Sequence, residues 1–122
     1  MALGKIKADT LEHSTAGAVD TKFVVNGSAK QWAKFTVAAV LNDSLNTSSI
    51  TDTGTGNFEV NFLNVMGNAN YAVSTCTFTI YGRETHCDAS STSAYGVATW
   101  YNMTRSEDSI TNCGTAALGD LA

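Results

Sequence analysis

The densest group of chemically active side chains in this sequence lies in the segment ETHCD. It carries a carboxylate, an imidazole, a thiol and a second carboxylate at Glu84, His86, Cys87 and Asp88. Neighbouring side chains on an extended backbone point in opposite directions, so this spacing does not bring all four donors to one small ion. A metal ion on a threefold axis, bound by one His86 from each of three subunits, is the arrangement the segment could support. An ordinary exposed loop explains the same residues, and we predict no metal site and no cofactor in the single chain.

A nucleophilic catalytic device would need a histidine that is oriented by a third group. The two histidines, His13 and His86, both lie in polar segments, and neither segment contains a strained nucleophile turn of the G-x-S-x-G kind. The run Thr53-Gly54-Thr55-Gly56 lacks the GK[ST] ending of a phosphate-binding loop and is interpreted as a turn. We therefore predict no catalytic residue and no enzyme activity.

Cleavage of a glycosidic bond would need two carboxyl groups at a fixed separation. The acids that could supply such a pair are Asp52, Glu59, Asp88, Glu107 and Asp108. Solvated acids on the surface of a chain with a net charge of −4 explain them better. A polysaccharide-degrading module is therefore kept only as a distant alternative.

The aromatic residues near the polar segment allow two interpretations. Exposed aromatic rings stack on sugar rings and anchor protein interfaces, whereas in a small β protein such rings more often pack in the core or between subunits. The interpretation as packing is favoured. Segment 82–94 is predicted to be the longest loop, and recognition often resides in such loops. The candidates for receptor or subunit contacts are Arg83, His86, Tyr95, Trp100 and Tyr101.

The composition limits the classes of partner. A chain of 122 residues with a net charge of −4 and no basic patch is not expected to bind nucleic acid. The longest apolar run, Phe35 to Leu41, is far shorter than the about 20 residues that span a bilayer. The first five residues lack the apolar core of a secretory signal, so assembly in a cytoplasm is expected. The three cysteines have no metal-site or disulfide-framework spacing and are predicted to be buried or free thiols. The alternative is one disulfide, formed if the protein meets oxidising surroundings after its release.

Strand signals dominate from residue 23 onward. Asn57 to Phe62 alternates apolar and polar side chains, as a strand with one buried face does. Ala33, Phe35 and Val37 also fit one strand face, and Asn42 to Ser44 is interpreted as a polar loop. Residues 71–81 fit a strand whose faces agree only if a β-bulge lies near Ser74 and Thr75. Further strands are predicted at 95–103 and 109–113, and the tail at 114–122 is expected to be mobile or to lie on a neighbour.

These signals predict an all-β protein, an antiparallel β-sandwich that is jelly-roll-like. Residues 1–22 have few apolar anchors and are predicted to form an extended N-terminal arm, and residues 23–122 are predicted to form the sandwich. Ordering of the arm by a neighbouring chain and fraying of a free terminus both remain open.

The run SSITDTGTGNFEVNF followed by NANYAV resembles a module of tail-fibre and other virion structural proteins of tailed bacteriophages. The segments GKIKADTLEHSTAG and VNGSAKQWAKF resemble the lead-in of such proteins, so the similarity covers about the first two thirds of the chain. The resemblance implies a virion component but transfers no catalytic residue. We expect a homotrimeric tail-fibre or spike-type protein that contacts other virion proteins and a host receptor or glycan. The alternative is a decoration protein that stabilises the capsid.

Overall fold

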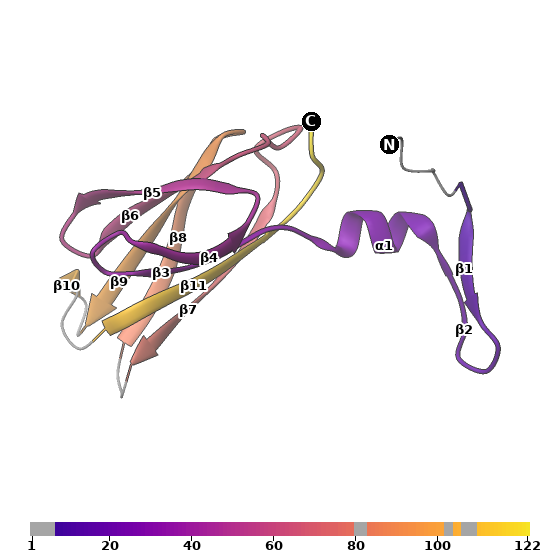
Figure 1. Ribbon diagram of the computed structural model, residues 1–122, viewed down its shortest axis with the longest axis horizontal. Coiled ribbons are helices and arrows are strands. Elements are labelled where there is room, and N and C mark those ends of the chain that lie inside the picture. Colours follow the sequence, from indigo (N-terminus) through magenta and orange to yellow (C-terminus); the bar gives the residue numbers. More distant parts are fainter. Residues whose placement is uncertain (1–6, 80–82, 102–103, 106–109) are drawn as a thin grey trace.

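The computed structural model describes residues 7–79, 83–101, 104–105 and 110–122. From residue 29 onward the described chain forms two antiparallel β-sheets packed face to face, and a short arm projects from one end of this sandwich (Figure 1). The predicted class, an all-β antiparallel sandwich, is confirmed.

The first sheet has four strands in the order β4-β3-β11-β7. Its strands are β3 (Ala29–Thr36), β4 (Leu41–Leu45), β7 (Ala72–Thr79) and β11 (Ile110–Leu118). The C-terminal strand β11 lies in the middle and pairs with both β3 and β7. Two strands far apart in the sequence, β3 and β7, are therefore joined through the last strand of the chain.

The second sheet has β9 (Ala94–Tyr101) near its centre. β9 pairs with β6 and with β10 in the path β10-β9-β6-β5, and β8 also pairs with β9. The remaining bounds are β5 (Thr47–Gly54), β6 (Asn57–Phe62), β8 (Arg83–Ser90) and β10 (Thr104–Arg105).

The chain passes from one sheet to the other at Asn46, which lies between β4 and β5 and has a φ of 54°. Asparagine tolerates this left-handed conformation better than most residues. Its side chain accepts a hydrogen bond from the Asn64 amide at 2.6 Å and donates one to the Asn64 carbonyl at 3.0 Å. The side chain of Asn46 thus ties the corner to the loop that follows β6.

The core lies between the two sheets and follows the predicted alternation. Phe58, Val60 and Phe62 of β6 are buried, as are Ala33 and Phe35 of β3. The rings of Phe35 and Phe58, from different sheets, meet edge to face with centroids 5.4 Å apart. These predicted core faces are confirmed.

Two strands occupy segments for which the sequence predicts a loop or a tail. Asn42 to Ser44 lies inside β4, and residues 114–118 lie inside β11 between β3 and β7. The predictions of a loop and of a mobile tail were therefore wrong. The segment GTAAL carries glycine and alanine where a strand signal needs larger apolar side chains, yet Thr115 and Ala117 face the core and are buried.

The predicted β-bulge near Ser74 and Thr75 was also wrong. β7 pairs with β11 without a shift from Ala72 to Phe78, and the irregularity lies in β11 between Ile110 and Asn112. β7 therefore keeps one alternation, in which Thr75 is partly buried whereas Phe78 is 47% exposed. β7 lies at the edge of its sheet.

The described residues 7–27, called the arm below, fold into a hairpin and a short helix. The hairpin pairs β1 (Thr10–His13) with β2 (Gly17–Asp20), and α1 (Thr21–Gly27) follows directly. The helix begins where the Thr21 amide and hydroxyl donate hydrogen bonds to the carbonyls of Asp9 and Ala8. α1 spans the boundary that the sequence predicts between residues 22 and 23, and the first strand of the sandwich begins at Ala29.

Gly119 provides a test of the packing at the end of β11. A Cβ atom at this position would lie 2.6 Å from the Cβ and 3.4 Å from the Cα of Tyr71, so backbone would have to move. Gly119→Ala is expected to lower the free energy of unfolding by about 1–3 kcal/mol in urea titrations. Gly27→Ala is the matched control, because nothing lies within 4 Å of the added Cβ. Equal stability of the two variants would contradict the close packing of Gly119 against Tyr71.

Candidate binding surfaces

The segment that carries the polar candidates is a strand. Residues 83–90 form β8, which pairs with β9 and places Glu84 opposite Trp100 and His86 opposite Ala98. The prediction of a long loop over 82–94 was therefore wrong for this part. Polar side chains dominate β8 because its outer face meets solvent, and composition alone does not separate such a strand from a loop. The candidate side chains are thus held on a sheet.

Three side chains gather on the outer face of this sheet. The Nε2 atom of His86 lies 3.3 Å from the Oε2 atom of Glu84, and the His86 ring lies 5.7 Å from the Trp100 ring in an edge-on arrangement. Both polar side chains are exposed, whereas Trp100 is partly buried. An aromatic ring flanked by an imidazole and a carboxylate suits contacts to a sugar or to a protein partner. Catalysis would need a further oriented group.

The structure separates the predicted contact residues. His86 and Trp100 lie together, whereas Tyr95 is 1% exposed and belongs to the core, so it is not part of any outer surface of this chain. The backbones of Arg83 and Tyr101 pair with each other, which places both at the same end of the sheet, but their side chains lie outside the described residues. Glu84, which was predicted only as part of the ETHCD segment, joins the surface cluster.

The hydroxyl of Tyr95 is the centre of a buried polar network that links the sheets. It donates a hydrogen bond to the Gln31 Oε1 atom at 2.8 Å and lies 2.6 Å from the Thr115 hydroxyl. Gln31 is fully buried and donates from Nε2 to the Thr47 hydroxyl at 2.9 Å. Burial raises the pKa of Tyr95 above its ordinary value and outweighs the hydrogen bonds with Thr115 and Gln31, which act in the opposite direction. The network therefore joins the two sheets through hydrogen bonds inside the core, and we interpret its role as structural.

The other titratable candidates are dispersed. Within residues 7–79, 83–101, 104–105 and 110–122, no cluster of three or more His, Cys, Asp or Glu side chains could bind a metal ion. His13 lies in the hairpin of the arm, where its Nδ1 atom accepts the Ala16 amide at 3.1 Å. Asp52 accepts the Gly54 amide at the β5–β6 turn, and Glu59 is exposed on β6. The placement of Glu107, Asp108 and the Asp88 side chain lies outside the described residues.

A second surface, missed by sequence reasoning, is the outer face of the four-stranded sheet. Trp32 is 37% exposed, and Leu45, its partner on β4, is 49% exposed. We call this outer surface the apolar sheet face. It also presents Lys34, Cys76, Phe78, Gly114 and Ala116. The alternation of β3 predicts that Trp32 points outward. The outward direction of Phe78 was missed because the bulge predicted in β7 would have turned this side chain toward the core.

A depression of about 280 Å³ lies on this face. Its lining includes Ser74, Cys76, Gly114 and Ala116. It exists because Gly114 has no side chain, since a Cβ atom there would lie 2.9 Å from the Cys76 Sγ atom. The Nζ atom of Lys34 lies 4.9 Å from the centre of the Phe78 ring beside it. The apolar sheet face therefore combines a hollow, two exposed aromatic rings and one cation.

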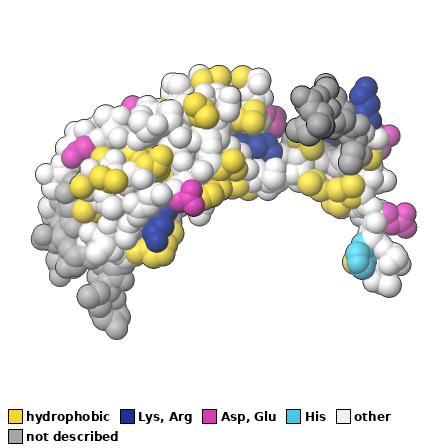
Figure 2. All heavy atoms as spheres, in the orientation of Figure 1, with side chains coloured by type: hydrophobic (Ala, Val, Ile, Leu, Met, Phe, Trp, Pro, Cys, Tyr) yellow, Lys and Arg dark blue, Asp and Glu magenta, His cyan; other side chains and the backbone are white. Residues whose placement is uncertain are grey.

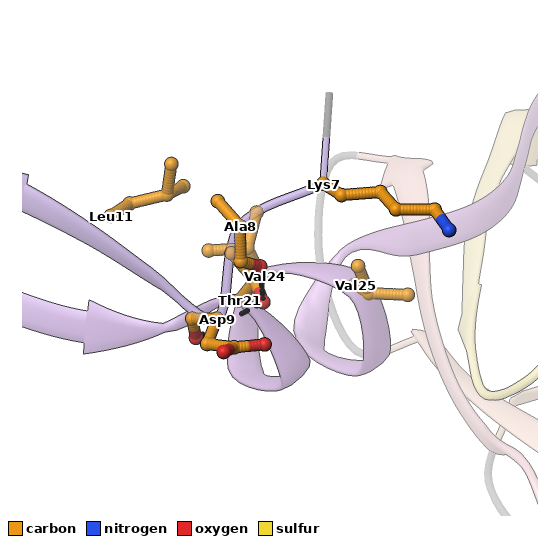
Figure 3. Close-up of a pocket in the computed structure, with 7 residues that line it drawn as sticks. All are labelled: Lys7, Ala8, Asp9, Leu11, Thr21, Val24 and Val25. Carbon is orange, nitrogen blue, oxygen red and sulfur yellow. Dashed lines mark hydrogen bonds between the residues drawn. The ribbon is translucent and has the colours of Figure 1, made fainter. Parts of the chain in front are cut away.

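The arm has a groove of its own, of about 540 Å³ (Figure 3). It is lined by Lys7, Ala8, Asp9, Leu11, Thr21, Val24 and Val25, which come from the segment that precedes β1, from β1 and from α1. The three larger apolar side chains of this lining are 44–58% exposed. A groove with apolar walls on so small an arm suits contact with another protein surface.

Of the three cysteines, Cys76 and Cys87 are exposed free thiols, and Cys113 is buried. Of the helices among the described residues, none is long and apolar enough to cross a membrane. Searches found no matching family model, no similar curated protein and no similar solved structure.

Proposed function

We propose that this chain is a structural protein of a tailed-phage particle, a tail-fibre or spike-type component that takes part in host attachment as a homotrimer. The observation that carries the proposal is a β-sandwich joined to a projecting arm whose apolar side chains meet solvent (Figures 1 and 2). Such side chains are characteristic of a subunit that is completed by its neighbours. The resemblance of the β5–β7 segment to phage virion proteins supports the same assignment.

In this proposal the cluster of Glu84, His86 and Trp100 contacts the host receptor or glycan. The cluster lies on a sheet, which keeps its geometry fixed, and it combines an aromatic ring with charged and polar groups. These are the groups that recognise a sugar or a protein loop. A metal bound by His86 on a threefold axis of the same trimer is only a minor alternative, and no metal is part of the proposal. The protein would be assembled in the host cytoplasm and reside in the virion.

Competition for host adsorption tests this function. Purified protein at micromolar concentration is expected to slow adsorption of the phage that encodes it to host cells, measured as free phage remaining over time. The His86→Ala/Trp100→Ala double variant should compete less well, whereas Glu59→Ala, which changes an exposed acid on β6, should compete as the wild type does. Equal loss or equal retention of competition in both variants would contradict the placement of the receptor site.

Capsid decoration is the second candidate, and the same arm favours it. An arm with exposed apolar side chains could lie across neighbouring shell proteins and clamp them. In that case purified protein would bind to particles lacking it and raise their resistance to heat, and it would leave adsorption unchanged. A polysaccharide-degrading module stays a distant third, to be revived only by activity on host polysaccharide that is lost when single acids are changed.

A further inference from the structure

We propose that the arm of one subunit docks on the apolar sheet face of a neighbouring copy of the same chain. This inference rests on the homo-oligomer within the proposed function and is independent of where in a particle that oligomer resides. It assigns the contact between subunits to the arm of one copy and the apolar sheet face of the next.

The exposed surface area of the chain is larger than that of a compact monomer of the same mass. The chain exposes 7755 Å². A compact monomer of 12.8 kDa is expected to expose about 6,300 Å². The excess of about 1,500 Å² matches the area that a standard stable protein interface buries. Docking of the arm on a second copy would remove an area of this order from water.

The helix of the arm cannot be stable in isolation. α1 has seven residues and no buried residue. Phe23, Val24 and Val25 are 63%, 44% and 58% exposed, and three successive residues cover more than half of the circumference of a helix. Helices shorter than about 12 residues are marginal in water, and a helix that is apolar on most sides is normally enclosed. The arm therefore needs a surface from outside itself.

The connection to β3 directs the arm away from its own sandwich (Figure 1). The ammonium group of Lys30 donates hydrogen bonds to the Val25 carbonyl at the end of α1, to the Ser28 carbonyl and to the Ser28 hydroxyl. The Ser28 hydroxyl also donates to the Val25 carbonyl at 3.1 Å. These bonds fix the end of the helix to the start of β3, so the surface that receives the arm belongs to another copy.

The apolar sheet face is the surface with matching chemistry. It presents Trp32, Leu45 and Phe78 near the depression at Gly114. The outer face of the opposite sheet presents Asn57, Glu59, Glu84 and His86, with Trp100 partly buried among them. Figure 2 shows hydrophobic side chains on the hollow side between sandwich and arm. A large side chain such as Phe23 would have a hollow to enter, with flanking rings to pack against.

Charge also favours this pairing. The arm carries the acids Asp9, Glu12 and Asp20 against two lysines, so its net charge is negative. The described strands of the receiving sheet carry Lys30 and Lys34 against a single acid, Asp43, which makes this sheet positive in a chain with a net charge of −4. Lys34 lies on the docking face itself, above Phe78, and Asp43 of β4 is paired opposite it. The net positive charge of the sheet, rather than an unpaired lysine, is what favours the acidic arm.

Cysteine cross-linking tests the contact in the full-length chain. Asn26 is exposed on α1 and lies one turn from Phe23 on the same side, so Asn26→Cys leaves the apolar residues intact. The change is made together with Cys87→Ser, so that Cys76 is the exposed native thiol. Mild oxidation is expected to give covalent oligomers on a non-reducing gel, with a disulfide between positions 26 and 76 identified by peptide mass spectrometry.

Thr53→Cys in the same background is the control, because Thr53 is exposed at the end of β5 on the other sheet. It is expected to give no link to Cys76. A link that joins position 26 of one copy to position 26 of another, a link from the control at equal yield, or an oligomer by light scattering without any 26–76 link would overturn the docking but leave the homo-oligomer standing. A monomeric mass by light scattering would overturn both.

Discussion

Replacement of Phe35 by alanine is expected to lower the free energy of unfolding by about 3–5 kcal/mol. Phe35 is fully buried on β3 and packs edge to face on Phe58 of the opposite sheet, with ring centroids 5.4 Å apart. Its removal would lose the favourable free energy of transferring the ring from water to the core, and it would leave a cavity between the two sheets. Because the chain is small, a loss of this size is a large share of its stability.

Phe78→Ala is the matched control for Phe35→Ala. Phe78 is 47% exposed on the apolar sheet face, where its ring lies beside the Lys34 ammonium group and Gly114. The expected loss in the dissociated chain is within about 1 kcal/mol. Urea unfolding followed by tryptophan fluorescence measures both. A similar loss in the two variants would contradict the assignment of Phe35 to the core and Phe78 to the surface.

The second large effect is expected at Tyr95. Tyr95→Phe removes the hydroxyl that serves Gln31 and Thr115 and leaves their buried polar atoms unsatisfied, at a cost of about 1–3 kcal/mol. Gln31→Leu is expected to cost a similar amount. The double variant should lose less than the sum of the two single losses, because each change already breaks the shared hydrogen bond. Additive losses in urea unfolding would mean that the two residues do not act as one network.

The raised pKa of Tyr95 gives the network a signature in its pH dependence. In the unfolded chain Tyr95 titrates near its ordinary value of 10.0, whereas in the folded chain burial holds its pKa higher. The folded state therefore keeps the proton longer, and stability falls as the pH rises above about 10, by up to about 1.4 kcal/mol per pH unit. The fall between about pH 8 and about pH 11 is expected to be smaller in Tyr95→Phe. An equal fall in both proteins would contradict the burial of this hydroxyl.

The sequence predicts the fold well where one face of a strand is strongly apolar. The apolar faces of residues 58–62 and 33–35 lie in the core as predicted. Only one of the two faces of each strand is apolar, so the sequence determines which face is buried. Residues 114–118 of β11 were missed because their hydrogen-bonded partners, β3 and β7, come from distant parts of the chain. Strand β8 was missed although it pairs with the next strand, β9. The polar or small side chains of both segments carry no local signal. Order in these strands is supplied by the sheet.

The candidate surfaces were predicted only in part, for the same reason. His86 and Trp100 were identified as contact residues, and the pairing of β8 with β9 brings them together. Tyr95 was predicted as a contact residue for the same reason, because it is aromatic, but it lies on the inward side of β9 and packs in the core. The apolar sheet face was missed because its members come from four strands, and only the register of those strands shows that they share one side.

The copy number of this chain in purified particles tests the proposed function most directly. Quantitative mass spectrometry would measure its ratio to the major capsid protein in virions of the phage that encodes it. The proposal predicts that the chain is present, at one to two orders of magnitude fewer copies than the capsid protein. A ratio close to that of the capsid protein would replace the tail assignment by capsid decoration. Absence of the chain from purified virions would contradict the assignment as a virion structural protein.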